Sequence, residues 1–235
     1  MNIAIVGYGK MGKTIEHLAK EKGHKIAVIF DKTPTHSELR DHKIDVAIEF
    51  SHPDAAFENL NVLLGSNIPT VCGTTGWLGK LDQIEQKVTQ YNGSFLYASN
   101  FSLGVNLFFE IVQQTAQLMK DQDLYDLKLT EIHHTQKKDT PSGTAITIAE
   151  KIMQKTGFEH WSLDKKEGKK DIPIYALREP EVPGTHIVEY FSDIDSIELK
   201  HTANSRDGFA LGAIKAAEYI YDKKGIFTMK DVLGI

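Results

Sequence analysis

Residues 2–12 read NIAIVGYGKMG, in which a short apolar run leads directly into the pattern GxGxxG. A β-branched run of this kind predicts a strand buried on both faces, and the apolar residues after the glycines recur with the period of a helix. Glycines between a strand and a helix allow a tight turn, close approach of a pyrophosphate to the backbone, and close helix packing. The first N–H groups of the helix then point at the phosphates. The stretch therefore predicts a dinucleotide site at Gly7, Gly9 and Gly12.

Further apolar runs follow this first strand, with helix-like segments between them. The predicted strands cover residues 25–30, 45–50, 69–72 and 94–98. Strands that alternate with helices predict a parallel, doubly wound sheet. Asp31 ends the second run, where a carboxylate accepts hydrogen bonds from the adenosine ribose.

Two other loops follow predicted strands at the edge where open α/β sheets bind ligands. The fourth strand leads into Gly73-Thr74-Thr75-Gly76, and the fifth leads into Ser99-Asn100-Phe101. Small and hydroxyl residues there allow the backbone to approach a nicotinamide ribose. Ordinary structural turns are the competing interpretation of both loops.

The pattern changes after Asn100. A long helix is expected from Ser102 to about Lys120, because apolar residues recur at helical spacing. Strand-like runs are expected at 124–131, 172–177, 185–191 and 194–201, with a helix at 140–156 and a charged solvated loop at 164–171. A hairpin turn at Ser192-Asp193 makes this second sheet at least partly antiparallel. The fold class is thus α/β, with an N-terminal Rossmann-like doubly wound parallel sheet and a second α+β domain with a mixed sheet.

The last helix, from about Ser205, has an apolar face without a partner in the second sheet. That face consists of Ala210, Ile214, Ala217 and Tyr221. We expect the helix to pack back on the first sheet. The dinucleotide-binding domain then comprises residues 1–101 and 206–235, and the substrate-binding domain comprises residues 102–205.

Composition limits the possible partners. The net charge of −5 disfavours nucleic acid, whose partners usually carry a basic excess. The single cysteine, Cys72, excludes a disulfide framework and fits a reducing compartment. The first apolar run is too short for a secretory signal or a membrane span, so a cytoplasmic protein without a membrane partner is expected.

A second chemical site is indicated by residues 131–145, which read EIHHTQKKDTPSGTA. His133 and His134 lie where a predicted strand ends, and Ser142 and Thr144 lie at the start of the next helix, with Pro141 suited to its first turn. Free N–H groups, hydroxyls and the cationic Lys137 together predict a pocket for a carboxylate or phosphate. A metal site is the alternative, but adjacent strand residues point to opposite faces and no known ligand spacing is completed, so no metal is expected.

The chain resembles the dihydrodipicolinate reductase (4-hydroxy-tetrahydrodipicolinate reductase) family over nearly its whole length. The resemblance rests on GYGKMG, GTTGW, SNFSLGVN, EIHHTQKKDTPSGTA, LREPEVPGTHIVEYFSD and HTANSRDGFALGA. It implies reduction of a cyclic dicarboxylate by NADH or NADPH in lysine and diaminopimelate biosynthesis. It also implies a homotetramer formed through the second sheet.

The resemblance assigns roles to individual residues. His133 becomes the acid/base candidate, Lys137 a proton donor and substrate anchor, and His134 a substrate contact, while Ser142, Gly143 and Thr144 hold a substrate carboxylate. The cofactor would be lined by Gly7, Gly9, Lys10, Met11, Gly12, Asp31, Gly73, Thr74, Thr75, Ser99, Asn100 and Phe101. The chain is short for the family and its glycine loop is one residue tighter than a common form. Thr135 and Gln136 also stand where many relatives have a basic or histidine residue.

Asp31 alone favours NADH, because a carboxylate repels the 2′-phosphate of NADPH. Lys32, helped by Lys10, offsets this repulsion, so both cofactors are expected. Two alternatives stay open. One is another two-domain nicotinamide-dependent dehydrogenase acting on open-chain substrates, and the other is a non-catalytic, redox-sensing nucleotide-binding module.

Overall fold

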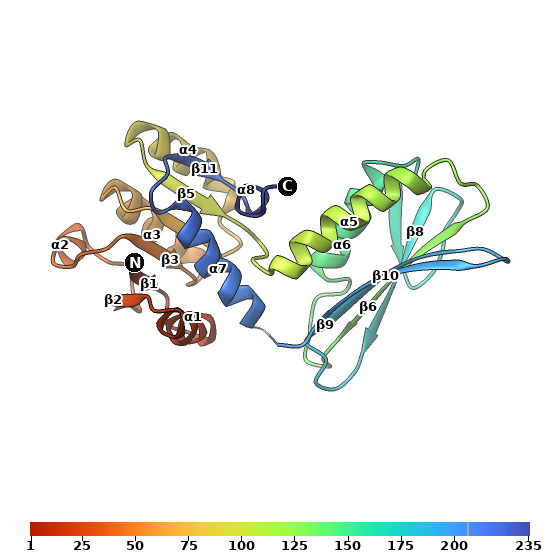
Figure 1. Ribbon diagram of the computed structural model, residues 1–235, viewed down its shortest axis with the longest axis horizontal. Coiled ribbons are helices and arrows are strands. Elements are labelled where there is room, and N and C mark those ends of the chain that lie inside the picture. Colours follow the sequence, from red (N-terminus) through yellow and green to blue (C-terminus); the bar gives the residue numbers. More distant parts are fainter. Residues whose placement is uncertain (206) are drawn as a thin grey trace. The chain divides into compact units, whose positions relative to one another are not determined.

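A computed structural model describes residues 1–205 and 207–235. The chain forms two compact units, Met1–Leu103 with Asp207–Ile235, and Gly104–Arg206 (Figure 1). Arg206, at which a domain boundary was predicted, lies outside the described residues. Each unit has its own buried apolar core.

The first unit contains a six-stranded sheet in which all paired strands are parallel. The strands are β1 (Asn2–Val6), β2 (Lys25–Phe30), β3 (Val46–Glu49), β4 (Thr70–Cys72), β5 (Ser94–Tyr97) and β11 (Gly225–Phe227), in the spatial order β11-β5-β4-β3-β1-β2. The chain runs from β1 to β2 on one side and then to β3 on the other, so the strand order reverses at β1. The loops after β1 and β3 meet there, because Val6 pairs with Glu49.

Helices cover both faces of this sheet (Figure 1). Side chains alternate along β1, so Ile3 and Ile5 enter one apolar cluster while Ala4 and Val6 enter another. One face packs against α1 (Lys10–Glu21), α7 (Asp207–Ile220) and α8 (Met229–Leu233). The other packs against α2 (His36–Arg40), α3 (Pro53–Gly65) and α4 (Leu81–Gln90), which follows the 3₁₀ turn Leu78–Lys80.

The end of the chain contains more structure than the single helix that its apolar pattern predicts. The helix α7 buries Ala210, Ile214 and Ala217, but Tyr221 lies beyond its last turn and is exposed. The chain then adds β11 to the sheet beside β5 and ends with α8. Both elements are too short to show a period in the sequence.

The second unit contains a five-stranded mixed sheet in the order β10-β9-β6-β8-β7. Its elements are α5 (Leu103–Met119), β6 (Asp126–His133), α6 (Gly143–Met153), β7 (His160–Leu163), β8 (Asp171–Arg178), β9 (Gly184–Phe191) and β10 (Ser196–Ala203). Strand β9 pairs antiparallel with β6 and β10, whereas β8 pairs parallel with β6 and β7. The predicted class, a parallel sheet followed by a mixed second sheet, is confirmed.

Several predicted boundaries in this unit are wrong. Strand β6 continues to His133, and α6 begins only at Gly143, so Pro141 precedes the capping residue Ser142 instead of lying in the first turn. The β9–β10 connection extends to Asp195, because the Ser192 hydroxyl accepts hydrogen bonds from the N–H groups of Ile194 and Asp195. Strand β7 was not predicted. Asp171, placed in a solvated loop, is fully buried at the start of β8.

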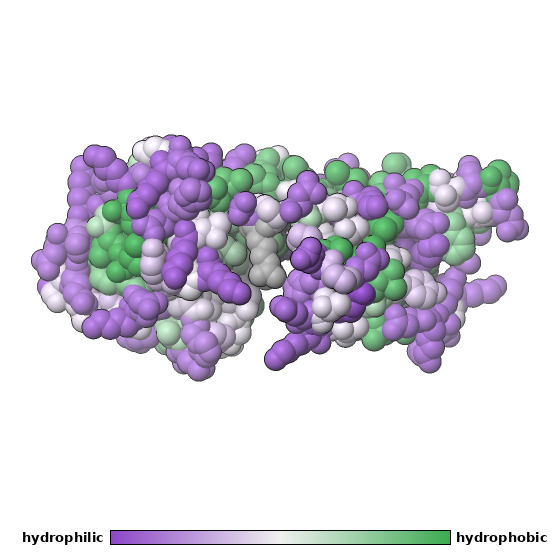
Figure 2. All heavy atoms as spheres, turned by 90° about the horizontal axis from the view of Figure 1, so that it is seen from below, coloured by the Kyte–Doolittle hydropathy of each residue, from purple (hydrophilic) through white to green (hydrophobic). Residues whose placement is uncertain are grey.

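Hydrophilic residues cover much of the face drawn in Figure 2, with hydrophobic residues exposed between them. Within the described residues, none of the helices has the length and hydrophobicity needed to cross a membrane.

Candidate active site

The glycine loop after β1 is shaped by the absence of side chains. Gly7 has φ +92°, and a Cβ there would lie 2.0 Å from the carbonyl oxygen of Phe50. A Cβ on Gly12 would lie 2.2 Å from the carbonyl oxygen of Gly7. Among the described residues, no atom lies within 4 Å of the Cβ position of Gly9. Gly7 and Gly12 therefore permit the turn and the helix packing, while Gly9 leaves open space beside the backbone.

The N-terminus of α1 suits an anionic ligand. Gly9 is its capping residue, no side chain caps the helix, and its first turn holds no acidic residue. The first N–H groups are thus left for a ligand, and the positive end of the helix dipole favours phosphate. Together with the glycine loop, this N-terminus fits the pyrophosphate of a dinucleotide.

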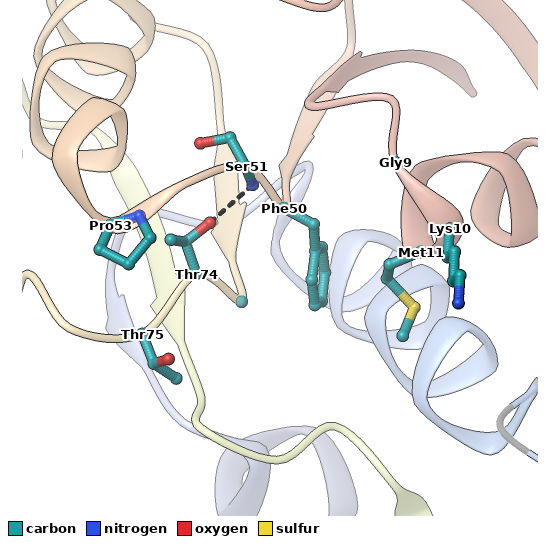
Figure 3. A pocket seen from close by; sticks show the side chains of 9 residues that line it. Gly9, Lys10, Met11, Phe50, Ser51, Pro53, Thr74 and Thr75 are labelled. Carbon is teal, nitrogen blue, oxygen red and sulfur yellow. Dashed lines mark hydrogen bonds between the residues drawn. The ribbon is translucent and has the colours of Figure 1, made fainter. Parts of the chain in front are cut away.

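A cavity of about 310 Å³ lies beside this helix start (Figure 3). It is lined by Gly9, Lys10, Met11, Phe50, Ser51, Pro53, Gly73, Thr74 and Thr75. The N–H of Ser51 donates to Thr74 Oγ1 at 2.7 Å, which ties the loop after β3 to the loop after β4. The glycine loop and the predicted Gly73–Thr75 loop thus line one cavity.

The other predicted cofactor residues lie in different places. Asp31 is exposed directly after β2, where its carboxylate accepts a hydrogen bond from the N–H of Tyr8 at 3.2 Å, and Lys32 beside it is also exposed. Ser99, Asn100 and Phe101 follow β5 but are not among the residues that line the cavity. The Phe101 ring is 1% exposed and contacts the Phe50 ring at a centroid distance of 5.5 Å. Its side chain is therefore a core group.

A buried carboxylate supports the loop after β3. Glu49 is fully buried and accepts hydrogen bonds from Ser51 Oγ, from Asn59 Nδ2 at 3.2 Å and from Cys72 Sγ at 3.2 Å. Burial, followed by the nearby Glu49 charge, raises the pKa of the Cys72 thiol well above its usual value. Cys72 is thus a protonated donor in the core and not a nucleophile.

The second unit carries the histidines. His133 is the last residue of β6 and is 7% exposed, whereas the next residue, His134, is half-buried. Burial lowers the pKa of His133, and the charges of Lys137 and Arg178 lower it further, while Glu131 and Asp139 act in the opposite direction. The ring is therefore mainly neutral at neutral pH.

Lys137 lies in the turn that follows β6. Its N–H donates to the carbonyl of His134 at 3.1 Å, and its ammonium group contacts both carboxylate oxygens of Asp139, at 2.8 and 2.7 Å. Hydrogen bonding from Lys137 lowers the pKa of Asp139. A substrate carboxylate that binds Lys137 has to compete with Asp139.

The helix α6 begins at the predicted anion site. Ser142 is the capping residue, and its hydroxyl accepts a hydrogen bond from the N–H of Ala145 at 3.1 Å. Gly143 is exposed, with no atom of residues 1–205 or 207–235 within 4 Å of its Cβ position, and Thr144 is half-buried. Among the described residues, open space therefore lies beside Gly143 at the start of this helix.

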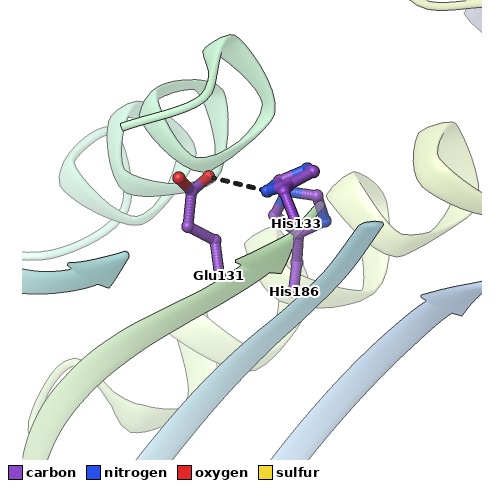
Figure 4. A group of neighbouring side chains, drawn as sticks. All are labelled: Glu131, His133 and His186. Atoms are coloured by element: carbon purple, nitrogen blue, oxygen red, sulfur yellow. Dashed lines mark ion pairs between the residues drawn. The ribbon is translucent and has the colours of Figure 1, made fainter. Parts of the chain in front are cut away.

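A buried network joins this helix start to His133. Figure 4 shows three of its side chains, those of Glu131, His133 and His186. The fully buried Glu131 accepts a hydrogen bond from the N–H of Ser142 at 3.0 Å, and its Oε2 lies 3.6 Å from His133 Nδ1. Arg178 contacts the other oxygen of Glu131 at 3.4 Å, and His186 Nε2 lies 3.3 Å from the Ser142 hydroxyl. Burial lowers the pKa of His186 to about 3, so this ring is neutral.

Glu131, His133 and His186 offer possible metal-binding atoms within 4.8 Å of one another, a set that the sequence pattern did not reveal. The guanidinium group of Arg178 already lies against Glu131, and the charge of Lys137 acts on both histidines. Positive charge next to the carboxylate disfavours a bound cation. The arrangement fits an anion that binds beside the histidines.

Sequence reasoning missed Glu131, Arg178 and His186 as members of this site, as well as Phe50, Ser51 and Pro53 in the first unit. A partial signal existed for each group. Glu131 and His133 are two residues apart on one strand and therefore share a face, and the segment Phe50–Pro53 follows a parallel strand at the ligand-binding edge. The register of the strands brings Arg178 and His186 to the site, because Arg178 pairs with His133 and His186 pairs with Glu131.

Both halves of the chain match known family models, described as dihydrodipicolinate reductase, N-terminus (residues 1–101) and C-terminus (residues 104–233). A 4-hydroxy-tetrahydrodipicolinate reductase of Christiangramia forsetii is 52% identical, over 100% of this chain and 98% of that one. Another, of Alkaliphilus oremlandii, is 35% identical over 100% of this chain and 99% of that one. A solved structure of dipicolinate-bound dihydrodipicolinate reductase from Paenisporosarcina sp. TG-14 has the same fold, with a TM-score of 0.82 over 97% of both chains at 21% identity. The chain therefore belongs to the dihydrodipicolinate reductase family.

Proposed function

We propose that this chain reduces 4-hydroxy-tetrahydrodipicolinate to tetrahydrodipicolinate with NADH or NADPH, a step of lysine and diaminopimelate biosynthesis. The observation that carries the proposal is the 52% identity to a reductase of this name over the whole chain. The glycine loop at Gly7, Gly9 and Gly12 and the start of α6 at Ser142 support the two binding functions that such a reaction needs.

The dinucleotide supplies the hydride when it is bound. Its pyrophosphate would lie against the glycine loop and the start of α1, and the cavity lined by Lys10, Met11, Gly73, Thr74 and Thr75 would hold the parts beyond it. Asp31 would accept hydrogen bonds from the adenosine ribose, and Lys32 would bind a 2′-phosphate. Ser99, Asn100 and the backbone of Phe101 are proposed to complete the nicotinamide end.

In the second unit, the substrate would bind through its two carboxylates. Ser142, Gly143 and Thr144 would hold one carboxylate at the start of α6, with His134 as a further contact. Lys137 would leave Asp139 and bind the substrate. Loss of the substrate hydroxyl as water and addition of the hydride consume one proton, which Lys137 or His133 would deliver.

A dianionic substrate also acts on His133. Negative charge beside the ring favours its protonated form, so substrate binding opposes the effect of burial, which lowers the pKa of His133. His133 would thus gain a proton as the substrate binds and become a competent acid only in the complex.

We further propose that residues 1–101 and 206–235 form the dinucleotide-binding domain and that residues 102–205 bind substrate and form a homotetramer through the second sheet. Strand β10 supports the oligomer, since it is an edge strand, Ile197 on it is 41% exposed, and Ile194 in the preceding turn is 82% exposed. The one cysteine is buried and unpaired, which fits the proposed cytoplasmic location.

The test is oxidation of NADH and NADPH by the purified protein with the condensation product of pyruvate and aspartate semialdehyde. We expect turnover with both cofactors, formation of tetrahydrodipicolinate, and inhibition by dipicolinate. Turnover only with open-chain aldehydes or amino acids would assign the chain to another dehydrogenase. Cofactor binding without any turnover would favour a sensing module.

A further inference from the structure

Glu131 is a buried acid in the second unit for which the proposed reaction has no assigned role. Its side chain is fully buried. It belongs to the alternating row Leu127, Leu129, Glu131 and His133, which all point to the buried face of the sheet. An acid in such a position is costly unless charged or hydrogen-bonding partners surround it. The partners it has are therefore informative.

These partners belong to the substrate site. One carboxylate oxygen accepts the N–H of Ser142, the residue that caps α6, and the other contacts Arg178 at 3.4 Å. Arg178 in turn donates to the carbonyl of Asp139 at 2.9 Å and to Thr140 Oγ1 at 2.6 Å. Glu131 and Arg178 thus fix both ends of the Asp139–Ser142 segment that leads into the anion pocket.

The same carboxylate faces His133. Nδ1 of His133 is buried and has no hydrogen-bond partner among the described residues, although Glu131 Oε2 lies only 3.6 Å away. Catalytic hydrogen bonds are often long without substrate and shorten in the complex. On its other side the ring lies against Gly184, where a Cβ would be 3.1 Å from Nε2. His133 Nδ1 and Glu131 Oε2 therefore need only a small shift to form a hydrogen bond.

We propose that Glu131 is a positioning residue of this reductase, which orients the His133 ring through Nδ1 and holds the start of α6 in place for the substrate carboxylate. The proposal rests on the proposed function and deepens it. An acceptor on Nδ1 fixes the proton there and leaves Nε2 as the nitrogen that meets the substrate.

Glu131→Gln tests this with little change of shape, because its amide oxygen still accepts the N–H of Ser142. We expect kcat to fall about tenfold or more, since the charged acceptor of His133 is lost, while the Kd of NADH changes less than about twofold. KM for the dicarboxylate should rise, because Arg178 loses its partner.

A pH profile separates positioning from a structural role. The charged and titratable groups around His133 are Glu131 on its own strand, Lys137 and Asp139 from the next turn, Arg178 from β8 and His186 from β9. Neutralising Glu131 removes a charge that raises the pKa of His133 and leaves the cations that lower it. The limb of kcat/KM that reports His133 should therefore move to lower pH.

Asp171→Asn is the matched control, because Asp171 is also fully buried in this sheet but lies at the far end of β8 from Arg178. It should lower stability without moving the pH profile. Wild-type kinetics in Glu131→Gln, or equal kinetic losses in both variants, would overturn the proposal. Absence of turnover in the wild-type protein would instead refute the proposed function.

A measurement on the wild-type protein keeps the proposal testable if Glu131→Gln does not fold. Nitrogen NMR of labelled histidines, with His133 assigned from the spectrum of His133→Gln, reports which ring nitrogen carries the proton. We expect the neutral His133 ring to be protonated on Nδ1. A neutral ring protonated on Nε2 contradicts the proposal, whether or not turnover has been found.

Discussion

The starts of α1 and α6 both suit an anion but are built in opposite ways. At α1, Gly9 caps the helix without a side chain. The loop before it can form its tight turn because a Cβ on Gly7 or Gly12 would collide with the backbone. At α6, Ser142 caps the helix and is supported by Glu131 and His186. The first arrangement offers backbone N–H groups and shape to a large ligand. The second places ionisable groups beside the helix start, as the proposed proton transfer to a small substrate requires.

The largest expected effect is a loss of kcat that leaves cofactor binding unchanged. His133→Ala and Lys137→Ala should each lower kcat by about 100-fold or more, because a proton donor is lost. Lys137→Ala should also raise KM for the dicarboxylate, while the Kd of NADH stays near the wild-type value in both variants. Steady-state kinetics and cofactor titration decide this. Unchanged turnover in both variants would remove the ionisable groups from the reaction.

Buried ionisable groups should also make the stability of the second unit sensitive to acid. His186 has a pKa of about 3 because of burial, whereas in the unfolded chain its pKa is about 6.5. Between these values the unfolded chain binds a proton that the folded chain does not, so stability falls as the pH falls. At about pH 5 the loss is about 2 kcal/mol.

His186→Gln should therefore show a smaller drop in the free energy of unfolding between about pH 7 and pH 5 than the wild-type protein does. Urea unfolding at both pH values measures the difference. His17→Gln, at an exposed histidine in the first unit, is the matched control. Equal pH dependence in the wild type and His186→Gln would show that His186 does not stay neutral in the fold.

A pair of glycine variants tests the comparison directly. In the part of the chain that the structure describes, neither Gly9 nor Gly143 has an atom within 4 Å of its Cβ position, so alanine fits at both places. A methyl group would instead meet the ligand, and such overpacking costs about 1–3 kcal/mol. Gly9→Ala should raise the Kd of NADH about tenfold, and Gly143→Ala should raise KM for the dicarboxylate by a similar factor.

Gly79→Ala is the control. The Cβ position of Gly79 also has open space around it among the described residues, but Gly79 is not one of the residues that line the cavity. Thermal unfolding should be nearly unchanged in all three variants. If Gly9→Ala weakens the dicarboxylate and the cofactor equally, the two helix starts do not have separate tasks.

The two sites also differ in how far sequence could predict them. The glycine loop can be read from one short stretch of sequence, because the strand, the turn and the helix follow one another along the chain. Gly7, Gly9 and Gly12 lie within that stretch. The stretch around His133 and Ser142 was visible for the same reason. Glu131, Arg178 and His186 come together only through the register of β6 with β8 and β9, which no local pattern specifies.

The same reasoning explains the errors in the fold. Long amphipathic elements such as α5 are predictable from period alone, whereas β7, β11 and α8 are too short to show one. The charged run at residues 164–171 predicted a solvated loop, but Asp171 is fully buried. One oxygen of its carboxylate accepts hydrogen bonds from the Ser162 hydroxyl and the N–H of Glu167, and those partners become visible only in three dimensions.

A cation beside the first site should strengthen the binding of NADPH. Lys32→Ala should weaken NADPH about tenfold and hardly change NADH, because a hydrogen bond to a charged group contributes on the order of 1.5–3 kcal/mol. Dissociation constants for both cofactors measure this, with Lys43→Ala as a control at another exposed lysine of the same unit. Equal losses for NADH and NADPH would mean that Lys32 does not bind the 2′-phosphate.

The smallest expected effect concerns Asp139, which pairs with Lys137, the proposed substrate anchor. The pair is partly exposed, with contacts at 2.8 and 2.7 Å, and such pairs contribute about 0.2–1 kcal/mol. Asp139→Asn should free Lys137 and lower KM for the dicarboxylate by up to about fivefold, with no change in the Kd of NADH. Glu167→Gln is a matched control, because Glu167 forms an exposed pair with Lys165 at the same sequence spacing. A higher KM in Asp139→Asn would mean that Asp139 holds Lys137 ready for the substrate instead of competing for it, and the α6 site would then be preorganised like the α1 site.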